Sequence, residues 1–347
     1  MKILVVGDPY MSAAVFERAL APLAAEHEFS FLQIDGGSGF QPQTPSERAI
    51  REYAGTPASV AERLSDEEAL VVHGAPVTDA VLGASPKLKL VCCARGGPVN
   101  VDLAAASRLG IPVVTTPGKN AEAVADLTLA LLLMLARDIP GALRFVATSG
   151  DLGGSAFEGS GFFGRDLAGQ TLGLVGFGQV GTRVARRALA FGMTVLVYDP
   201  WVERARIDGP GVSASSLTDL LAWSDFVSLH ARATVENKNL FSRGQFEAMR
   251  RGAYFVNTAR ETLVDEDALH EALISGRLAG AALDVIRPRP GGGAHPLTAL
   301  DNVIRTPHIG GATRETLARG AQMIAEEIRR FAAGQPLVHV ANREALR

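Results

Sequence analysis

A glycine-rich turn between two apolar runs constrains the fold of this chain more than any other feature. The stretch TLGLVGFGQVG is a buried-strand pattern that continues directly into Gly176, Gly178 and Gly181. A helical pattern follows, and a second apolar run ends at Asp199. In such a unit the three glycines permit the tight turn, the approach of a pyrophosphate and close packing of the helix on the strand, in that order. The segment therefore predicts a strand–turn–helix–strand unit that binds a dinucleotide.

The start of this helix and the end of the second strand predict the cofactor contacts. A helix N-terminus offers unpaired N–H groups and a partial positive charge to phosphates. Asp199 lies about twenty residues beyond the turn, where a carboxylate grips a ribose diol and repels a 2′-phosphate. We therefore expect NAD, and NADP is disfavoured rather than excluded because Arg204 and Arg206 follow closely. The predicted contacts in this unit are Gly176, Gly178, Gly181 and Asp199.

Length and composition set the class of protein. A chain of 347 residues exceeds one ordinary core, so two domains are expected. The formal net charge of −3 gives no sign of a nucleic-acid or membrane partner. The longest apolar stretch, Leu127–Ala136, is too short to span a bilayer. Cys92 and Cys93 are adjacent and form neither a disulfide framework nor a metal pattern, so buried strand positions and a cytoplasmic location are expected.

Short apolar runs alternate with helical patterns along the whole chain. This alternation predicts an α/β fold with mainly parallel sheets. Long helices are expected at Ala121–Arg137 and Thr313–Ala333, and the nucleotide-binding unit begins only after the first of them. The predicted strands are Ile3–Val6, Ala69–Val72, Leu88–Cys92, Val113–Thr115, Thr171–Val175, Thr194–Tyr198, Phe226–Leu229, Tyr254–Asn257, Ala281–Val285 and Val303–Thr306.

Polar side chains follow three of the later strands. Arg260 comes after the run YFVN, Asp284 after GAAL, and His308 after VIRTP. In an open α/β sheet, ligands bind beyond the carboxyl ends of the strands. Oxidation of a 2-hydroxy acid by a nicotinamide needs a base for the hydroxyl proton, a cation for the carboxylate, and N–H groups that grip the same carboxylate. His308, Arg260 and the loop Arg95–Gly97 could fill these roles.

Several motifs together make the chain similar to the D-isomer-specific 2-hydroxyacid dehydrogenases, in particular their phosphoglycerate-dehydrogenase-like branch. The resemblance covers nearly the whole chain. It rests on LGLVGFGQVG with Asp199, on NTARETLVDEDAL, GAALDV and TPHIGG, and on RGGPVNVDLAAASRLGIPVVTTPGKNAEAVADLTLALLLMLAR upstream. No C-terminal regulatory domain is expected after Arg347.

The resemblance implies two Rossmann-like domains and a homodimer built through the NAD domain. A flavodoxin-like substrate domain would comprise residues 1–118 and 312–347, and a doubly wound NAD-binding sheet residues 119–311. By position, Arg260 would orient the substrate and His308 would be the acid/base, while Arg95, Gly96 and Gly97 would lie in the substrate-carboxylate loop. The further cofactor contacts implied are Thr116, Gln179, Val180, Asp199, Thr258, Ala259 and Asp284.

The chain departs from the family pattern around the catalytic histidine. The family has an acidic partner, usually Glu, five positions after Asp284, where this chain has Arg289. Arg287 also replaces an often acidic residue, and Glu261 stands where Gly is common. A cation beside His308 would oppose protonation of its imidazole. Glu261 could replace the missing carboxylate, Arg289 could bind a second anionic group of the substrate, the site could bind NAD only, or Arg287 and Arg289 could face solvent.

The sequence thus predicts an NAD-dependent oxidoreductase that interconverts a polar D-2-hydroxy acid, a sugar acid being one candidate, and its 2-oxo acid. The alternative is an NAD-binding regulatory or sensor protein with weak or no catalysis. No metal site is expected, because no Cys, His and Asp cluster has ligand spacing. The remaining histidines, among them His73 and His295, show no partner pattern in the sequence.

Overall fold

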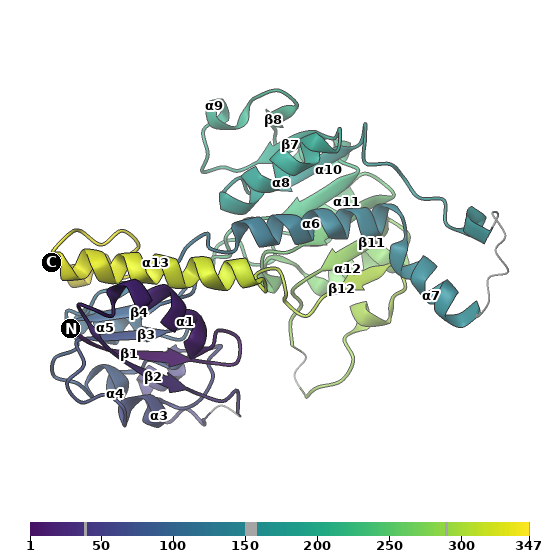
Figure 1. Cartoon of the computed structure of the whole chain (residues 1–347). Helices are drawn as coiled ribbons and strands as arrows, with labels where there is room; N and C mark the ends of the chain where they lie inside the picture. The colour runs from purple at the N-terminus through teal and green to yellow at the C-terminus, as the bar shows by residue number, and fades with distance from the viewer. Residues whose placement is uncertain (38–39, 150–157, 289–290, 347) are drawn as a thin grey trace. The chain divides into compact units, whose positions relative to one another are not determined.

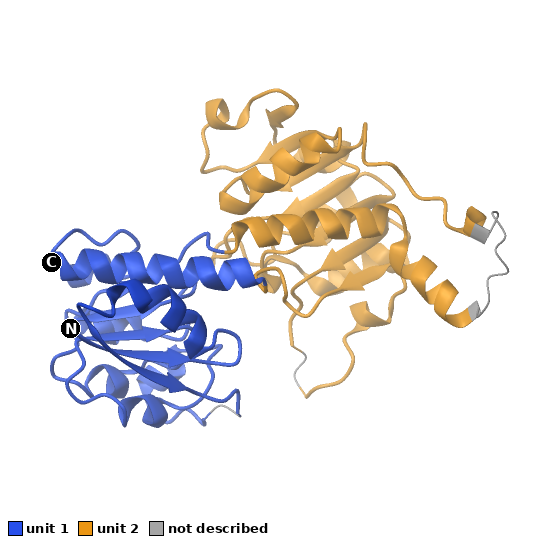
Figure 2. Cartoon of the chain, viewed as in Figure 1, with its two compact units in different colours: residues 1–119, 313–347 blue, residues 120–312 orange. Residues whose placement is uncertain are grey.

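The computed structural model describes residues 1–37, 40–149, 158–288 and 291–346 and divides the chain into two compact units. Unit 1 comprises Met1–Lys119 and Thr313–Arg347, and unit 2 comprises Asn120–Ala312 (Figure 2). The chain therefore leaves unit 1 after Lys119 and returns at Thr313, whereas the sequence predicted divisions at 118/119 and 311/312.

Unit 1 is built on a parallel five-stranded sheet with the order β2-β1-β3-β4-β5, the flavodoxin-like arrangement (Figure 1). Its strands are β1 (Lys2–Gly7), β2 (Glu28–Gln33), β3 (Ala69–Val72), β4 (Leu90–Cys93) and β5 (Val113–Val114). Its helices are α1 (Ala13–Leu20), α2 (Pro45–Ala49), α3 (Pro57–Ala61), α4 (Asp79–Leu82), α5 (Leu103–Arg108) and α13 (Arg314–Ala332), with 3₁₀ turns at Ala21–Leu23 and Arg343–Leu346.

Unit 2 is built on a parallel seven-stranded sheet with the order β12-β11-β10-β9-β6-β7-β8 (Figure 1). Its strands are β6 (Thr171–Val175), β7 (Thr194–Tyr198), β8 (Val212–Ala214), β9 (Phe226–Leu229), β10 (Ala253–Asn257), β11 (Leu278–Leu283) and β12 (Val303–Arg305). Its helices are α6 (Ala121–Ala136), α7 (Ile139–Ser149), α8 (Gln179–Ala190), α9 (Arg204–Ile207), α10 (Leu217–Trp223), α11 (Arg243–Ala248) and α12 (Glu266–Ile274), with 3₁₀ turns at Glu158–Gly161, Glu261–Leu263 and Pro296–Ala299.

The strand order of unit 2 reverses beside β6, which has β7 on one side and β9 on the other. Read from β8, the strands follow the sequence order 3-2-1-4-5-6-7, which is the doubly wound nucleotide-binding order with one strand added. Ligands of such sheets bind at this switch point, beyond the carboxyl ends of the strands. The α/β class with two parallel sheets predicted from the sequence is confirmed.

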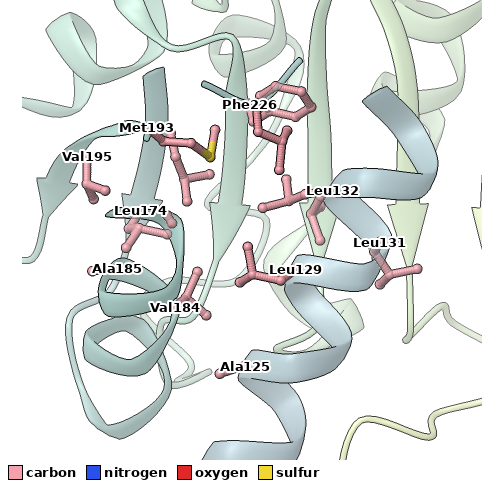
Figure 3. Packing of buried hydrophobic residues seen from close by; sticks show 14 of the residues in the cluster. Ala125, Leu129, Leu131, Leu132, Leu174, Val184, Ala185, Met193, Val195 and Phe226 are labelled. Carbon is pink, nitrogen blue, oxygen red and sulfur yellow. The ribbon is translucent and has the colours of Figure 1, made fainter. Parts of the chain in front are cut away.

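Both sheets are buried on their two faces, which explains the continuous apolar runs. In β1, Ile3 and Val5 pack in one core cluster, whereas Leu4 and Val6 pack in another on the opposite face. In unit 2, helix α6 covers one face together with α8. Figure 3 shows Leu129 of α6 near Val184 of α8 in this cluster. Burial of each such leucine contributes about 1.5–3 kcal/mol.

Two strands were not predicted from the sequence. Strands β2 and β8 lie at the ends of their sheets, and every residue of β2 is at least partly exposed. An edge strand of this kind lacks the continuous apolar run by which the other strands were found. The two cysteines are buried in β4, and the two long helices end within a residue of their predicted bounds.

Candidate functional site

The glycine turn lies at the carboxyl end of β6, and its geometry explains each glycine. Gly176 has a φ of 101°, and a Cβ there would lie 2.6 Å from the backbone of His230. A Cβ on Gly181 would lie 2.2 Å from the carbonyl oxygen of Gly176, so helix and turn can approach only without a side chain. A Cβ on Gly178 would meet no described atom within 4 Å, and this open position precedes a helix whose start has no side-chain cap. The turn therefore fits a bound pyrophosphate.

Asp199 is tied to this turn. Its Oδ2 accepts the N–H of Phe177 at 2.7 Å, and its Oδ1 accepts the N–H of Trp201 at 2.9 Å. The carboxylate thus lies beside the turn at the end of the neighbouring strand, where a ribose diol of the cofactor would be held. The residues present fit NAD at this edge of the sheet.

His230 ends the strand on the other side of the turn. Its Nε2 is 2.9 Å from the hydroxyl of Ser228, and burial lowers the pKa of its imidazole to about 3. The ring is neutral at physiological pH. It therefore adds a neutral ring and one hydrogen bond beside the glycine turn, and it adds no positive charge there.

Asp284 organises the segment that carries His308. Its Oδ1 accepts the N–H of Ile309 and its Oδ2 the N–H of Gly310, both at 2.8 Å. The hydroxyl of Thr306 donates to Oδ1 at 2.6 Å. His308 itself has a φ of 57°, in the left-handed region, and its N–H donates to the carbonyl of Asp284. A non-glycine residue there is strained, and the surrounding bonds hold it so that the imidazole is exposed.

Arg260 follows β10, and its side chain is also exposed. The side-chain amide of Asn257 donates to its carbonyl oxygen at 3.0 Å and accepts the N–H of Ala259 at 3.0 Å. The hydroxyl of Thr258 is buried against that of Thr128 at 3.0 Å. The loop is thus fixed through its backbone. The exposed guanidinium donates to the carbonyl oxygen of Ala259 at 2.7 Å through Nη1.

The sheet topology brings these predicted residues to one edge of unit 2. Strands β10, β11 and β12 are neighbours, and Arg260, Asp284 and His308 follow them in that order. The glycine turn and Asp199 follow β6 and β7 at the same edge, because all pairs in this sheet are parallel. The other predicted contacts, Arg95, Gly96, Gly97 and Thr116, belong to unit 1.

The segment after Asp284 differs from the sequence-based expectation. Arg287 does not face solvent. Its Nη2 donates to Asn239 at 2.6 Å and to the carbonyl of Val264 at 2.7 Å, while its N–H donates to Glu266. The solvent-facing alternative is therefore wrong for Arg287, because unpaired carbonyl and amide oxygens lie within its reach. Arg289, the residue at the position of the usual acidic partner, lies outside the described residues.

Two histidines that looked partnerless in the sequence have carboxylate partners. His295 Nε2 is 3.0 Å from Glu266, which is itself buried at the start of α12. His73 Nδ1 is 2.9 Å from Asp8, and the Tyr10 ring stacks on the imidazole. Each pair joins residues that are far apart in the sequence. The only sequence signal for the second pair is that Asp8 and His73 directly follow the buried strands β1 and β3.

The predicted carboxylate loop of unit 1 is held from several sides. The guanidinium of Arg95 donates to the carbonyl and carboxylate of Glu52, so the positive charge of Arg95 is already paired. The Arg95 carbonyl accepts the N–H of Thr116 at 2.8 Å. The N–H groups of Gly96 and Gly97 donate to no acceptor in the described part of the chain. The loop therefore offers two unbonded N–H donors, whereas the charge of Arg95 is paired.

The described residues contain neither a metal-binding cluster nor a membrane-spanning helix. No group of three or more His, Cys, Asp or Glu residues in these ranges could hold a metal ion. Within them, no helix combines the length and apolar character needed to cross a membrane.

Comparison with known proteins points to one family. A family model for the D-isomer specific 2-hydroxyacid dehydrogenase NAD-binding domain matches residues 129–310. A D-3-phosphoglycerate dehydrogenase of Archaeoglobus fulgidus is 41% identical over 276 residues, which are 79% of this chain and 51% of that protein. A glyoxylate reductase of Korarchaeum cryptofilum is 39% identical over 290 residues, 83% of this chain and 86% of that protein.

The solved structures agree with this family. The TT0316 protein of Thermus thermophilus has a TM-score of 0.77 at 35% identity, and the match covers 98% of this chain and 100% of that one. The chain spans about half the length of the curated phosphoglycerate dehydrogenases that it matches.

Proposed function

Because the chain belongs to the D-isomer-specific 2-hydroxyacid dehydrogenase family, we propose that it is an NAD-dependent oxidoreductase that interconverts a polar D-2-hydroxy acid and its 2-oxo acid. One observation carries the proposal. The NAD-binding turn, Arg260 and His308 lie at the same carboxyl edge of one parallel sheet, and both side chains are exposed there.

The residues of unit 2 divide the chemistry between them. The imidazole of His308 accepts the proton of the C2 hydroxyl in oxidation and returns it in reduction. The guanidinium of Arg260 binds the substrate carboxylate and the C2 oxygen, and so stabilises negative charge as it develops there. Bound NAD supplies the two-electron acceptor that these side chains lack. Asp284 holds the backbone around His308 and thereby positions the imidazole.

The substrate class is the finer part of the proposal. Relatives are named for phosphoglycerate and for glyoxylate, so membership of the family does not identify the substrate of this chain. We propose a polar acid, with sugar acids as the first class to examine, and we propose that the free N–H groups of Gly96 and Gly97 contribute to binding its carboxylate.

The test is NADH oxidation with a panel of 2-oxo acids that includes glyoxylate, hydroxypyruvate, pyruvate and 2-oxogluconate. We expect turnover of at least one polar acid. Arg260→Ala should lower kcat/KM about 100-fold by misplacing the carboxylate, whereas Arg251→Ala, an exposed arginine before β10, should not. Activity on pyruvate alone would contradict the polar substrate. NADH binding without turnover of any acid would favour the NAD-binding sensor instead.

We also propose that the protein is a homodimer formed through unit 2. Helix α7 and the segment after it expose apolar side chains, and Phe163 is 91% exposed while Leu143 is 63% exposed. Phe162 packs on Phe145 of α7 with ring centroids 5.4 Å apart, whereas Phe157 lies outside the described residues. An apolar surface of this kind is typical of a subunit contact. Sedimentation equilibrium should show a dimer that Leu143→Asp dissociates, and a monomeric wild-type protein would contradict the proposal.

A further inference from the structure

A buried lysine of unit 1 lies directly behind the predicted carboxylate loop. Lys119 is only 7% exposed, and its Nζ donates to the carbonyl oxygen of Ala94 at 2.5 Å. Ala94 is fully buried and immediately precedes Arg95. An ammonium group has three N–H donors, and this carbonyl is the only acceptor that the described residues offer it. A buried cation with so few partners needs an explanation, because its burial is costly.

The rest of unit 1 is shaped around this side chain. A Cβ on Gly320 of α13 would lie 2.9 Å from Cδ of Lys119, so a side chain there would require the lysine side chain to shift. The guanidinium of Arg319 donates to the Lys119 carbonyl. Two residues therefore hold the backbone of the loop. The N–H of Thr116 donates to the carbonyl of Arg95, and the ammonium of Lys119 donates to the carbonyl of Ala94.

We propose that Lys119 is a positioning residue for substrate binding, which fixes the Ala94–Arg95 backbone so that the free N–H groups of Gly96 and Gly97 face the substrate carboxylate. This inference rests on the proposed function. The charge of Lys119 is unneutralised by any direct ion pair in the described residues, so it also makes the loop more attractive to an anion.

The proposal predicts a dependence on pH. Burial, with a smaller contribution from Arg95, lowers the pKa of Lys119 to about 8, although Cys93 and Asp8 oppose this shift. Loss of the proton weakens the bond to Ala94, so carboxylate binding should weaken as pH rises through about 8. Three other titratable groups face Lys119, and none of them has its pKa near 8. The pKa of His73 is lowered by burial, that of Asp8 is held below its ordinary value by the bond to His73, and that of Cys93 is raised by burial to about 11. The guanidinium groups of Arg95 and Arg319 also lie close by.

The experiment measures binding of oxamate, an unreactive analogue of a 2-oxo acid, to the NADH complex between pH 7 and 9.5. We expect Lys119→Met to raise the oxamate Kd at pH 7 about 10-fold or more and to remove the part of the pH dependence centred near pH 8, with NADH binding and kcat little changed. Lys119→Arg, which stays charged, should restore binding without that dependence. Lys89→Met, which removes an exposed lysine bonded to Glu68, is the matched control.

Hydrogen exchange of the peptide covering residues 94–97 decides the inference without a substrate. It should become faster in Lys119→Met and stay unchanged in Lys89→Met. If the wild-type enzyme binds no acid at all, the proposed function fails while the exchange result still tests the role of Lys119 in the loop. Equal oxamate affinity and pH profile in Lys119→Met and wild type, or equal exchange, would overturn the inference.

Discussion

The carboxyl edges of the two sheets hold polar residues in different ways. In unit 1, the buried carboxylate of Asp8 binds the half-buried imidazole of His73 in addition to backbone N–H groups, and the buried Lys119 binds a neighbouring carbonyl. In unit 2, the carboxylates of Asp199 and Asp284 bind backbone N–H groups. The side chains of Arg260 and His308 remain exposed there.

The difference indicates that the two units hold their loops by different kinds of interaction. Buried ionisable groups fix the loops of unit 1 and make its stability sensitive to charge and pH. Backbone-bound carboxylates fix the turns of unit 2 and leave its reactive side chains available. Substitutions in unit 2 should therefore separate cofactor binding from folding more cleanly than substitutions in unit 1.

The largest expected effect comes from the two glycines around the start of α8. Gly181→Val should destabilise unit 2 by about 3 kcal/mol, because its Cβ would lie 2.2 Å from the Gly176 carbonyl oxygen. Gly178→Ala should leave the free energy of unfolding unchanged and weaken NADH binding at least about 10-fold, since the added methyl fills open space where phosphate would lie. Urea unfolding and NADH fluorescence titration measure the two effects. Tight NADH binding by Gly178→Ala would contradict the pyrophosphate site.

Removing the charge of Asp284 should have the next largest effect. Asp284→Asn places an NH₂ group opposite backbone N–H donors, so we expect a loss of about 2–3 kcal/mol in the free energy of unfolding. Turnover should fall as well, because the His308 backbone shifts. Asp301→Asn, whose side chain is 95% exposed, is the control and should match wild type in both measurements.

The pH dependence of stability should distinguish the two buried histidines. The folded-state pKa of His230 is about 3 and lies below its unfolded value of 6.5, so its contribution is present above pH 6.5 and is lost as pH falls toward 3. Between pH 7 and 5 the loss is about 2 kcal/mol, which His230→Gln should abolish. Burial also lowers the pKa of His73, but the Asp8 carboxylate opposes this, so His73→Gln should flatten the profile less. Equal flattening by both variants would show that the carboxylate has no such effect.

The smallest effect is expected at the end of α13. Glu326 binds Arg329 and Arg330 there, and all three side chains are substantially exposed. Solvent and salt screen such pairs. Arg329→Ala should leave the urea midpoint unchanged within error, and a clear decrease would mean that surface charge matters more in unit 1 than we infer.

Most of the fold and part of the candidate site could be predicted from the sequence. The runs that form β1 and β6 were visible because both faces of these strands are buried, and α13 was visible from its helical pattern. Strands β2 and β8 were not, since their sequences EFSFLQ and VSA interrupt the apolar residues with polar ones. The turn glycines and Asp199 follow a local spacing, so a motif could predict their positions after β6 and β7.

Partners that are distant in sequence could not be found in this way. Asp8 meets His73 only because β1 and β3 are neighbours in the sheet. Arg287 turns inward because Asn239 and the Val264 carbonyl offer acceptors that no linear pattern reveals. The buried side chain of Lys119 packs against Gly320, which is far away in the sequence.

The most direct test of the account compares wild type with His308→Gln in single-turnover oxidation of NADH by the best 2-oxo acid of the panel. Glutamine cannot transfer the proton, so the rate of the chemical step should fall by about 100- to 10,000-fold, while the NADH Kd, measured in parallel, stays the same. A rate within a few-fold of wild type would show that His308 is not the acid/base and would contradict the proposed chemistry.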